Sequence, residues 1–268
     1  MQKKCLILMN GIFTNINTSL KECHNNMNEM IVKNNPNYKF EIVINTSYNN
    51  IICQKKWKSG EYGENIYEKE IDKENLDNFI KKNYPNSTII YCNINEDIVS
   101  NPFKRLFFRI RNSYDAIKLE ELFFDKVILL RPDIIINKKI NLDHMSGFNM
   151  ICNVYTRPCN IHDRDWDLCW ISDLQEFKIW YYLNICFYYE YYHFDDKINM
   201  NYEKCLNEQK EFEKKFEEFY NIVNTEANLE TSYPLYYQHT HYIIYYMIKK
   251  GFKVSTCDNE ELFVQILR

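Results

Sequence analysis

Short apolar runs that alternate with helix-compatible stretches constrain the fold of this chain more than any other feature. The runs KCLILMN (4–10), FEIVINTS (40–47) and STIIYCN (87–93) are each long enough for one buried strand. The stretches between them end at breaks such as Asn35-Pro36-Asn37 and Pro85. Strands that alternate with helices predict an α/β fold with a mostly parallel central sheet and helices on both faces.

The most apolar run of the chain carries charge at its centre. The segment KVILLRPDIIIN (126–137) places Arg131, Pro132 and Asp133 between two apolar stretches. A buried charge is costly unless it is paired or holds a ligand. Because proline cannot donate to a strand ladder, the strand is predicted to stop at Pro132 and to present Asp133 to a cleft. Ligands of open α/β sheets bind beyond such strand ends.

Two chemistries suit these charges. A carboxylate at Asp133 suits a divalent cation that bridges phosphates, whereas the planar fork of Arg131 suits a diphosphate directly. The alternative is structural, an Arg–Asp ion pair that ties down the end of the strand.

The remaining segments complete the α/β pattern and add a helical, aromatic-rich C-terminal half. No linker or internal repeat divides the 268 residues, so a single domain is predicted. Residues 48–70 are polar and are expected to be irregular. The predicted helices are 73–84, 103–123, 171–192, 201–223 and 235–250, with Gly251 as the cap of the last one, and the further predicted strands are 148–155, 252–257 and 262–267.

Composition narrows the classes of function. A net charge of −4 offers no basic field for nucleic acid. The ten cysteines are scattered without a C-x-x-C pair, and the apolar start of the chain is too short for a signal peptide. We therefore expect reduced thiols in a cytoplasmic protein. The aromatic stretch 177–194 contains Lys178, Asn184 and Glu190, which favours a buried helix over a membrane span.

The order of the motifs resembles that of nucleotide-sugar glycosyltransferases with the GT-A fold, a group found in bacteria, algae and large viruses. The resemblance spans nearly the whole chain, although each motif is short. It departs from the group in two places: R-P-D stands where D-x-D is usual, and Thr14 stands where an arginine is frequent. The matching segments are LILMNGIF, FEIVINTS, FFRIRNSYDAIKLEELFFDKVILLRPDIII, DRDWDLCWISDLQEF and HYIIYYMIKKGFKVSTCDNEELFVQILR.

The resemblance implies a role for each half of the chain. Residues 1–137 would hold the nucleotide-sugar donor and residues 138–268 the acceptor. Arg131 and one base of a preceding helix, Arg111 or Lys118, would face the diphosphate; a solvated basic face is the alternative for these two. The residues that would border the nucleoside are Asn10, Gly11, Ile12, Thr46 and Ser47.

The resemblance also implies a metal. Asp133, together with His239 or His241, would hold Mn²⁺ or Mg²⁺. Histidines two apart cannot share one helical face, so only one of the two is expected to reach the metal. Because R-P-D has one carboxylate where D-x-D has two, binding of the phosphates without a metal remains an alternative.

An acidic loop, HDRDWDLCW (162–170), supplies candidates for the catalytic base. An inverting transferase needs a carboxylate to accept the proton of the attacking hydroxyl. Asp167 matches the acidic position of the group best, and Asp165 is the second candidate. Trp166 could stack on a sugar ring, whereas Trp170 is expected in the core.

The activity implied by the resemblance is transfer of a sugar, expected from a uridine diphosphate sugar, to a hydroxyl of a glycan or glycoprotein. Two alternatives remain. A nucleotidyltransferase on a similar sheet would usually bring a glycine- and lysine-rich loop near the N-terminus, where this chain has only Gly11. A non-catalytic glycan-binding module would not need clustered carboxylates. The motifs G-x-x-x-x-G-K, H-E-x-x-H and G-x-S-x-G do not occur.

Overall fold

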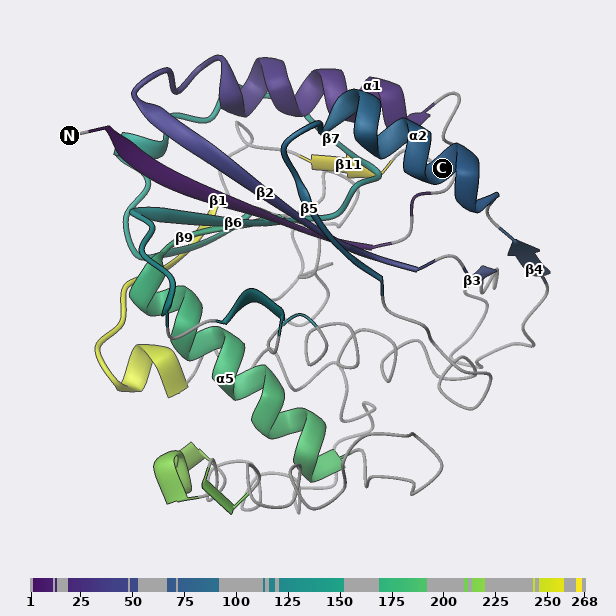
Figure 1. Cartoon of the computed structure of the whole chain (residues 1–268). Helices are drawn as coiled ribbons and strands as arrows, with labels where there is room; N and C mark the ends of the chain where they lie inside the picture. The colour runs from purple at the N-terminus through teal and green to yellow at the C-terminus, as the bar shows by residue number, and fades with distance from the viewer. Residues whose placement is uncertain are drawn as a thin grey trace, which may run out of the picture.

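A seven-stranded mixed sheet forms the centre of the protein (Figure 1). The computed structural model describes residues 2–11, 13, 19–47, 49–52, 67–70, 72–91, 113, 116–118, 121–151, 169–191, 210–211, 214–219, 243, 246–257 and 264–266. The strand order is β10-β8-β9-β6-β1-β2-β5. Its strands are β1 (Lys3–Asn10), β2 (Tyr38–Thr46), β5 (Thr88–Tyr91), β6 (Lys126–Leu130), β8 (Phe148–Ile151), β9 (Cys169–Asp173) and β10 (Val254–Cys257).

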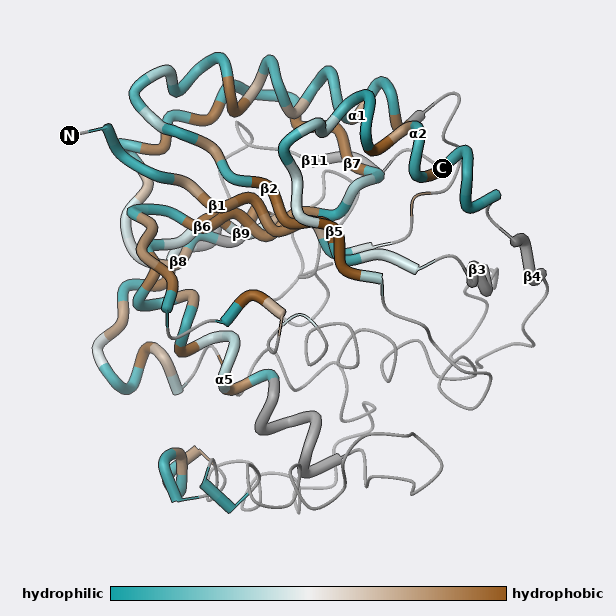
Figure 2. The backbone as a smooth tube through the Cα atoms, viewed as in Figure 1, coloured by the Kyte–Doolittle hydropathy of each residue, from teal (hydrophilic) through white to brown (hydrophobic). Residues whose placement is uncertain are grey.

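The sheet is mostly parallel, as predicted. All neighbouring strands pair in parallel except β9, which is antiparallel to both β6 and β8. The strands β1, β2, β6 and β9 form the apolar centre of the sheet (Figure 2). The predicted α/β class is therefore confirmed in the part of the chain that the structure describes.

Helices cover both faces of the sheet. The helices α1 (Ser19–Met27) and α2 (Lys73–Asn83) lie on one face, and a π-helical turn, η1 (Asn28–Val32), continues α1. The helix α5 (Leu174–Tyr191) lies on the other face (Figure 1). Side chains alternate along a strand, so Cys5, Ile7 and Met9 pack in the core beneath α1 and α2.

The core on the α5 face is aromatic. Trp170 of β9 and Trp180 of α5 meet edge to face, with 4.0 Å between ring centroids. Phe148 of β8 packs against both tryptophans. Trp170 is 5% exposed, so the prediction that it belongs to the core is confirmed.

The ends of the described helices follow their capping residues. Asp72 precedes α2 and accepts hydrogen bonds from the amides of Glu74 (3.0 Å) and Asn75 (3.3 Å). At the other end of the chain, the amides of Gly251 and Phe252 donate to the carbonyls of Ile248 (2.9 Å) and Met247 (3.0 Å). This pattern closes a helix with a left-handed glycine, as the sequence predicted for Gly251.

Two of the expected boundaries within the first half are wrong. Residues 48–70 are not wholly irregular, because β3 (Asn49–Ile52) and β4 (Tyr67–Glu70) pair as antiparallel strands. The helix predicted for 103–123 does not reach Phe123, since Lys118 adopts a positive φ of 47° and no helix continues through residues 122–125. A left-handed residue ends a helix because its backbone cannot continue the right-handed turn.

Strand pairing decided two further boundaries. The strand that begins at Lys126 stops before Pro132, as predicted, and the apolar residues beyond it form β7 (Ile134–Ile136), which pairs antiparallel with β11 (Val264–Ile266) outside the central sheet. The helix predicted to begin at Ile171 begins at Leu174, because residues 169–173 fill the gap between β6 and β8 as β9.

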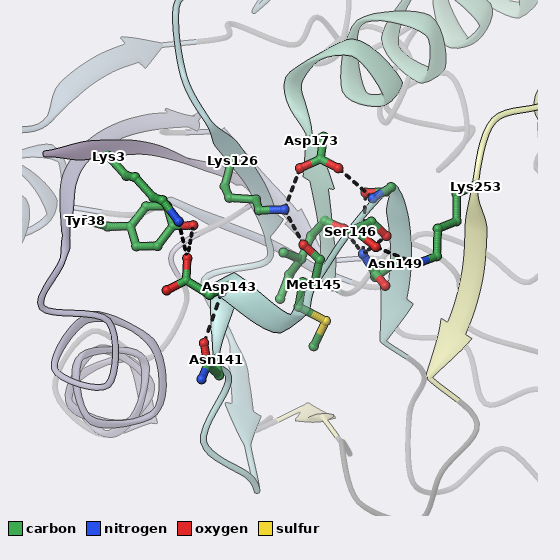
Figure 3. Close-up of polar contacts among 12 residues, drawn as sticks. Lys3, Tyr38, Lys126, Asn141, Asp143, Met145, Ser146, Asn149, Asp173 and Lys253 are labelled. Carbon is green, nitrogen blue, oxygen red and sulfur yellow. Dashed lines mark hydrogen bonds and ion pairs between the residues drawn. The ribbon is translucent and has the colours of Figure 1, made fainter. Parts of the chain in front are cut away.

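A polar cluster joins β6 to β9 at the amino-terminal end of β6 (Figure 3). The ammonium of Lys126, whose side chain is 10% exposed, lies 2.5 Å from the carboxylate of Asp173 and donates to the carbonyl of Met145. The other oxygen of Asp173 accepts from the amide of Gly147 at 2.6 Å. Asp173 ends β9 directly before α5, and these contacts give its carboxylate a structural role.

Gly147 is expected to tolerate no side chain. Its φ is +72°, and an added Cβ would lie 2.3 Å from the carbonyl oxygen of Lys253. That oxygen accepts a hydrogen bond from the amide of Phe148. We expect Gly147→Ala to lower the free energy of unfolding by about 2–3 kcal/mol, because backbone strain adds to overpacking. Gly251→Ala is the control: its φ is +81° with open space around it, so only about 1 kcal/mol is expected. Denaturant titration measures both, and equal losses would contradict the steric argument.

The helices in the described part of the chain contain no segment long and apolar enough to cross a membrane. The prediction that the start of the 177–194 stretch is buried holds, since Phe177, Trp180, Tyr181 and Asn184 are buried in α5. Cys5, Cys23 and Cys169 are buried free thiols.

Candidate functional site

The strand order reverses between β1 and β6. From β1 the chain proceeds outward through β2 to β5, and β6 then lies on the opposite side of β1. In open α/β sheets, ligands bind beyond the carboxyl ends of the strands at such a switch point. Met9 pairs with Leu130, so Asn10-Gly11 and Arg131-Pro132-Asp133 follow the two strands at the same level. The candidate site is therefore the carboxyl end of β1, β2 and β6.

Two polar side chains at this end are buried without a partner among the described residues. Asn10 is 9% exposed, and neither the nitrogen nor the oxygen of its amide forms a hydrogen bond. The hydroxyl of Thr46, which is fully buried, also lacks a bond. Buried polar groups in native proteins are normally satisfied, so a ligand is one candidate for the partner of Asn10.

The charged turn after β6 contains a closed ion pair. Arg131 donates from Nε to Oδ1 of Asp133 at 2.9 Å and from Nη2 to Oδ2 at 2.7 Å. The side chains are 32% and 14% exposed respectively. The strand stops at this turn, as predicted, and the Arg–Asp ion pair that the sequence offered as the structural alternative is formed.

Neighbouring segments hold this turn in place. An added Cβ at Gly11 would lie 2.7 Å from Cδ of Pro132, so the glycine lets the two loops touch. The amide of Gly11 donates to the carbonyl of Asn45 in β2 at 3.1 Å. On the far side of the turn, the Asn26 side chain exchanges two hydrogen bonds, of 2.9 and 2.7 Å, with the backbone of Ile136. The position of Arg131 is thus set from both sides.

The α1 helix adds to the electrostatics of the turn. Cys23 of α1 is buried, and burial together with the charge of Asp133 raises the pKa of its thiol to about 12. The helix lies against the segment that follows the turn, because Asn26 of α1 is bonded to the backbone of Ile136. The first turn of α1 carries the carboxylate of Glu22.

The described residues do not fit a divalent cation at this turn. Among them, no group of three histidine, cysteine, aspartate or glutamate side chains could hold a metal ion. Both oxygens of Asp133 already accept hydrogen bonds from Arg131. His239 and His241, the other predicted ligands, lie outside the described residues. The metal role of Asp133 stays a prediction.

The structure brings part of the predicted site together. Asn10, Gly11, Thr46, Ser47 and Arg131 lie at the carboxyl ends of adjacent strands. Lys118 is exposed, with its ammonium 3.6 Å from Glu121, which matches the solvated alternative. The predicted residues that lie outside the described part are Ile12, Arg111, Asp165, Trp166, Asp167, His239 and His241.

Two residues of this region were not singled out in the sequence. Asn26 lies in a polar helix where nothing distinguishes it from its neighbours, and its role follows only from the docking of α1 against β7. Cys23 was counted among scattered cysteines, although its place at an apolar position of α1 is a signal of burial.

Comparison with known proteins adds no assignment. No protein-family model matches the sequence, and the search of curated proteins gave no match.

Proposed function

We propose that this protein is a glycosyltransferase that moves a sugar from a uridine diphosphate sugar to a hydroxyl of a glycan acceptor. The observation that carries the proposal is the switch point between β1 and β6. There, a buried amide without a partner among the described residues ends β1, and an arginine follows β6. The order of sequence motifs, which resembles that of GT-A glycosyltransferases, supports the same reading. The acidic segment 162–168, which lies outside the described residues, supplies candidate carboxylates for the chemistry.

Each proposed role uses a distinct chemical property. The amide of Asn10 can both donate to and accept from a polar edge of the nucleoside. Gly11 lets the backbone approach the donor closely. Arg131 presents a planar fork to the diphosphate. Asp167 accepts the proton of the acceptor hydroxyl as the oxygen attacks the anomeric carbon, and UDP leaves with the electrons of the broken glycosidic bond.

Binding of the donor is testable without knowledge of the acceptor. A ligand that binds only the folded protein adds about 2.7 kcal/mol to its stability at 100 times its dissociation constant. We expect UDP and one or more UDP-sugars to raise the melting temperature, whereas uridine alone, which lacks the phosphates, should act more weakly. A panel of nucleotides and nucleotide sugars in a thermal shift assay measures this. If none of them shifts the transition, the donor site is refuted.

A second measurement separates transfer from binding. Release of UDP from the stabilising sugar donor should rise when a suitable glycan is added, because the acceptor hydroxyl is a better-placed nucleophile than water. If a UDP-sugar stabilises the protein but no added glycan leads to release of UDP, the binding-module alternative is favoured. Release of pyrophosphate from a nucleoside triphosphate would favour the nucleotidyltransferase.

A further inference from the structure

The ion pair between Arg131 and Asp133 gives the candidate site a property that the proposed function does not require. A donor site for a diphosphate needs positive charge, yet both hydrogen bonds of this guanidinium edge go to a carboxylate two residues away. The carboxylate is the more buried partner, with 14% of its side chain exposed against 32% for Arg131. The turn therefore carries no net charge as it stands.

We propose that Arg131 receives the diphosphate of the donor and that Asp133 is its resident counter-ion, so that the site binds a nucleoside diphosphate without a divalent cation. This inference rests on the proposed function. The exchange forms and breaks no covalent bond. Oxygens of the diphosphate replace the two carboxylate oxygens on the Nε and Nη2 edge of the guanidinium.

The geometry of the pair suits such an exchange. A phosphate presents two oxygens to the arginine fork in the same bidentate manner as a carboxylate. When no ligand is bound, Asp133 neutralises the charge of the partly buried guanidinium. The contacts of Gly11 with Pro132 and of Asn26 with Ile136 hold the backbone on both sides, so the fork needs little ordering when the ligand arrives.

The same geometry argues against Asp133 as the anchor of a metal. A cation there would compete with a guanidinium that is tethered on the same turn and bonded through both oxygens. Among the described residues, Asp133 also belongs to no group of three histidine, cysteine, aspartate or glutamate side chains that could hold a metal ion. Positive charge at the turn comes instead from the guanidinium of Arg131.

The two roles of Asp133 predict changes of opposite sign. As a counter-ion, Asp133 competes with the diphosphate and repels it, so Asp133→Asn should tighten UDP binding about tenfold in the absence of metal. As a metal ligand, it would be needed for binding, and the same variant would weaken it. Isothermal titration of UDP, with EDTA and separately with Mg²⁺ or Mn²⁺, measures the difference. Wild-type protein should bind in EDTA, and metal should change its dissociation constant less than about twofold.

A double variant tests Arg131 itself. Removing Arg131 alone would leave Asp133 as a partly buried carboxylate without its arginine partner, and the protein could fail to fold. Arg131→Gln combined with Asp133→Asn removes both charges at once and should bind UDP on the order of 10²-fold more weakly than Asp133→Asn. Melting temperatures measured without ligand show whether the variants are folded. The titration of the wild-type protein in EDTA tests metal-free binding even if a variant does not fold.

Each result decides the matter. UDP binding that requires metal and is lost in Asp133→Asn would make Asp133 a metal ligand and overturn the inference, while leaving the proposed function intact. Binding in EDTA that neither variant changes would place the phosphates away from the turn and also overturn it. Absence of UDP binding under all conditions would remove the proposed function, and this inference with it.

Discussion

Replacing Asp167 by asparagine is expected to lower sugar transfer by ~10²–10⁴-fold, the usual contribution of a general base. Asparagine keeps the size of the side chain but cannot accept the proton of the acceptor hydroxyl. Binding of UDP should stay unchanged, because a general base is expected to act on the acceptor hydroxyl and not on the diphosphate. Hydrolysis of the donor should fall less than transfer, since water can release its proton to solvent. Rates of transfer, rates of hydrolysis and the UDP dissociation constant measure the three effects.

Asp165→Asn is the matched control, with the same change of charge two residues away on the same loop. A loss in this variant alone would assign the base to Asp165. Equal losses in both variants would mean that the loop acts through its summed charge or its conformation. Full activity in both would contradict a base on this loop and would favour a retaining reaction or a binding module.

Asn10→Leu is expected to stabilise the empty protein and to abolish its response to UDP. The substitution replaces a buried amide that lacks a partner among the described residues with an apolar group of similar size. Removal of such a group should raise the free energy of unfolding by about 1–3 kcal/mol. The ligand then loses the amide that it would bond, so the stabilisation by UDP should disappear. Denaturant titrations with and without UDP measure both effects.

Asn35→Leu is the control for Asn10→Leu, because Asn35 is also buried but its side-chain amide is hydrogen-bonded. Its amide nitrogen donates to the carbonyls of Ile31 (2.7 Å) and Ile140 (2.8 Å), and its oxygen accepts from the amide of Leu142 (2.8 Å). Loss of these three bonds should cost about 3 kcal/mol. The free energies of unfolding of Asn10→Leu and Asn35→Leu are thus expected to differ by about 4–6 kcal/mol. If Asn10→Leu destabilises as much as Asn35→Leu, the partner of Asn10 belongs to the protein itself.

Local sequence determined the strands and helices whose signals are contained within one element. The run KCLILMN and the helix 73–84 were predictable because burial and capping act over a few residues, as Asp72 and the glycine at 251 show. The stop of the strand at Pro132 followed from the missing amide donor. The position of Arg131 at a strand end was predictable for the same reason, and that of Asn10 was predictable from the glycine that follows it.

Tertiary structure alone decided the features that depend on pairing between distant segments. The apolar stretch that begins at Cys169 becomes the strand β9 because β6 and β8 leave a gap between them, although its residues continue smoothly into a helix. Ile134–Ile136 leaves the central sheet because its partner is β11, more than a hundred residues later. The sequence offered the ion pair between Arg131 and Asp133 as one of two possibilities, and the tertiary structure made the choice between that pair and a carboxylate free to bind a ligand. That choice depends on how Gly11 and Asn26 fix the backbone on either side of the turn, and such contacts exist only once the chain has folded.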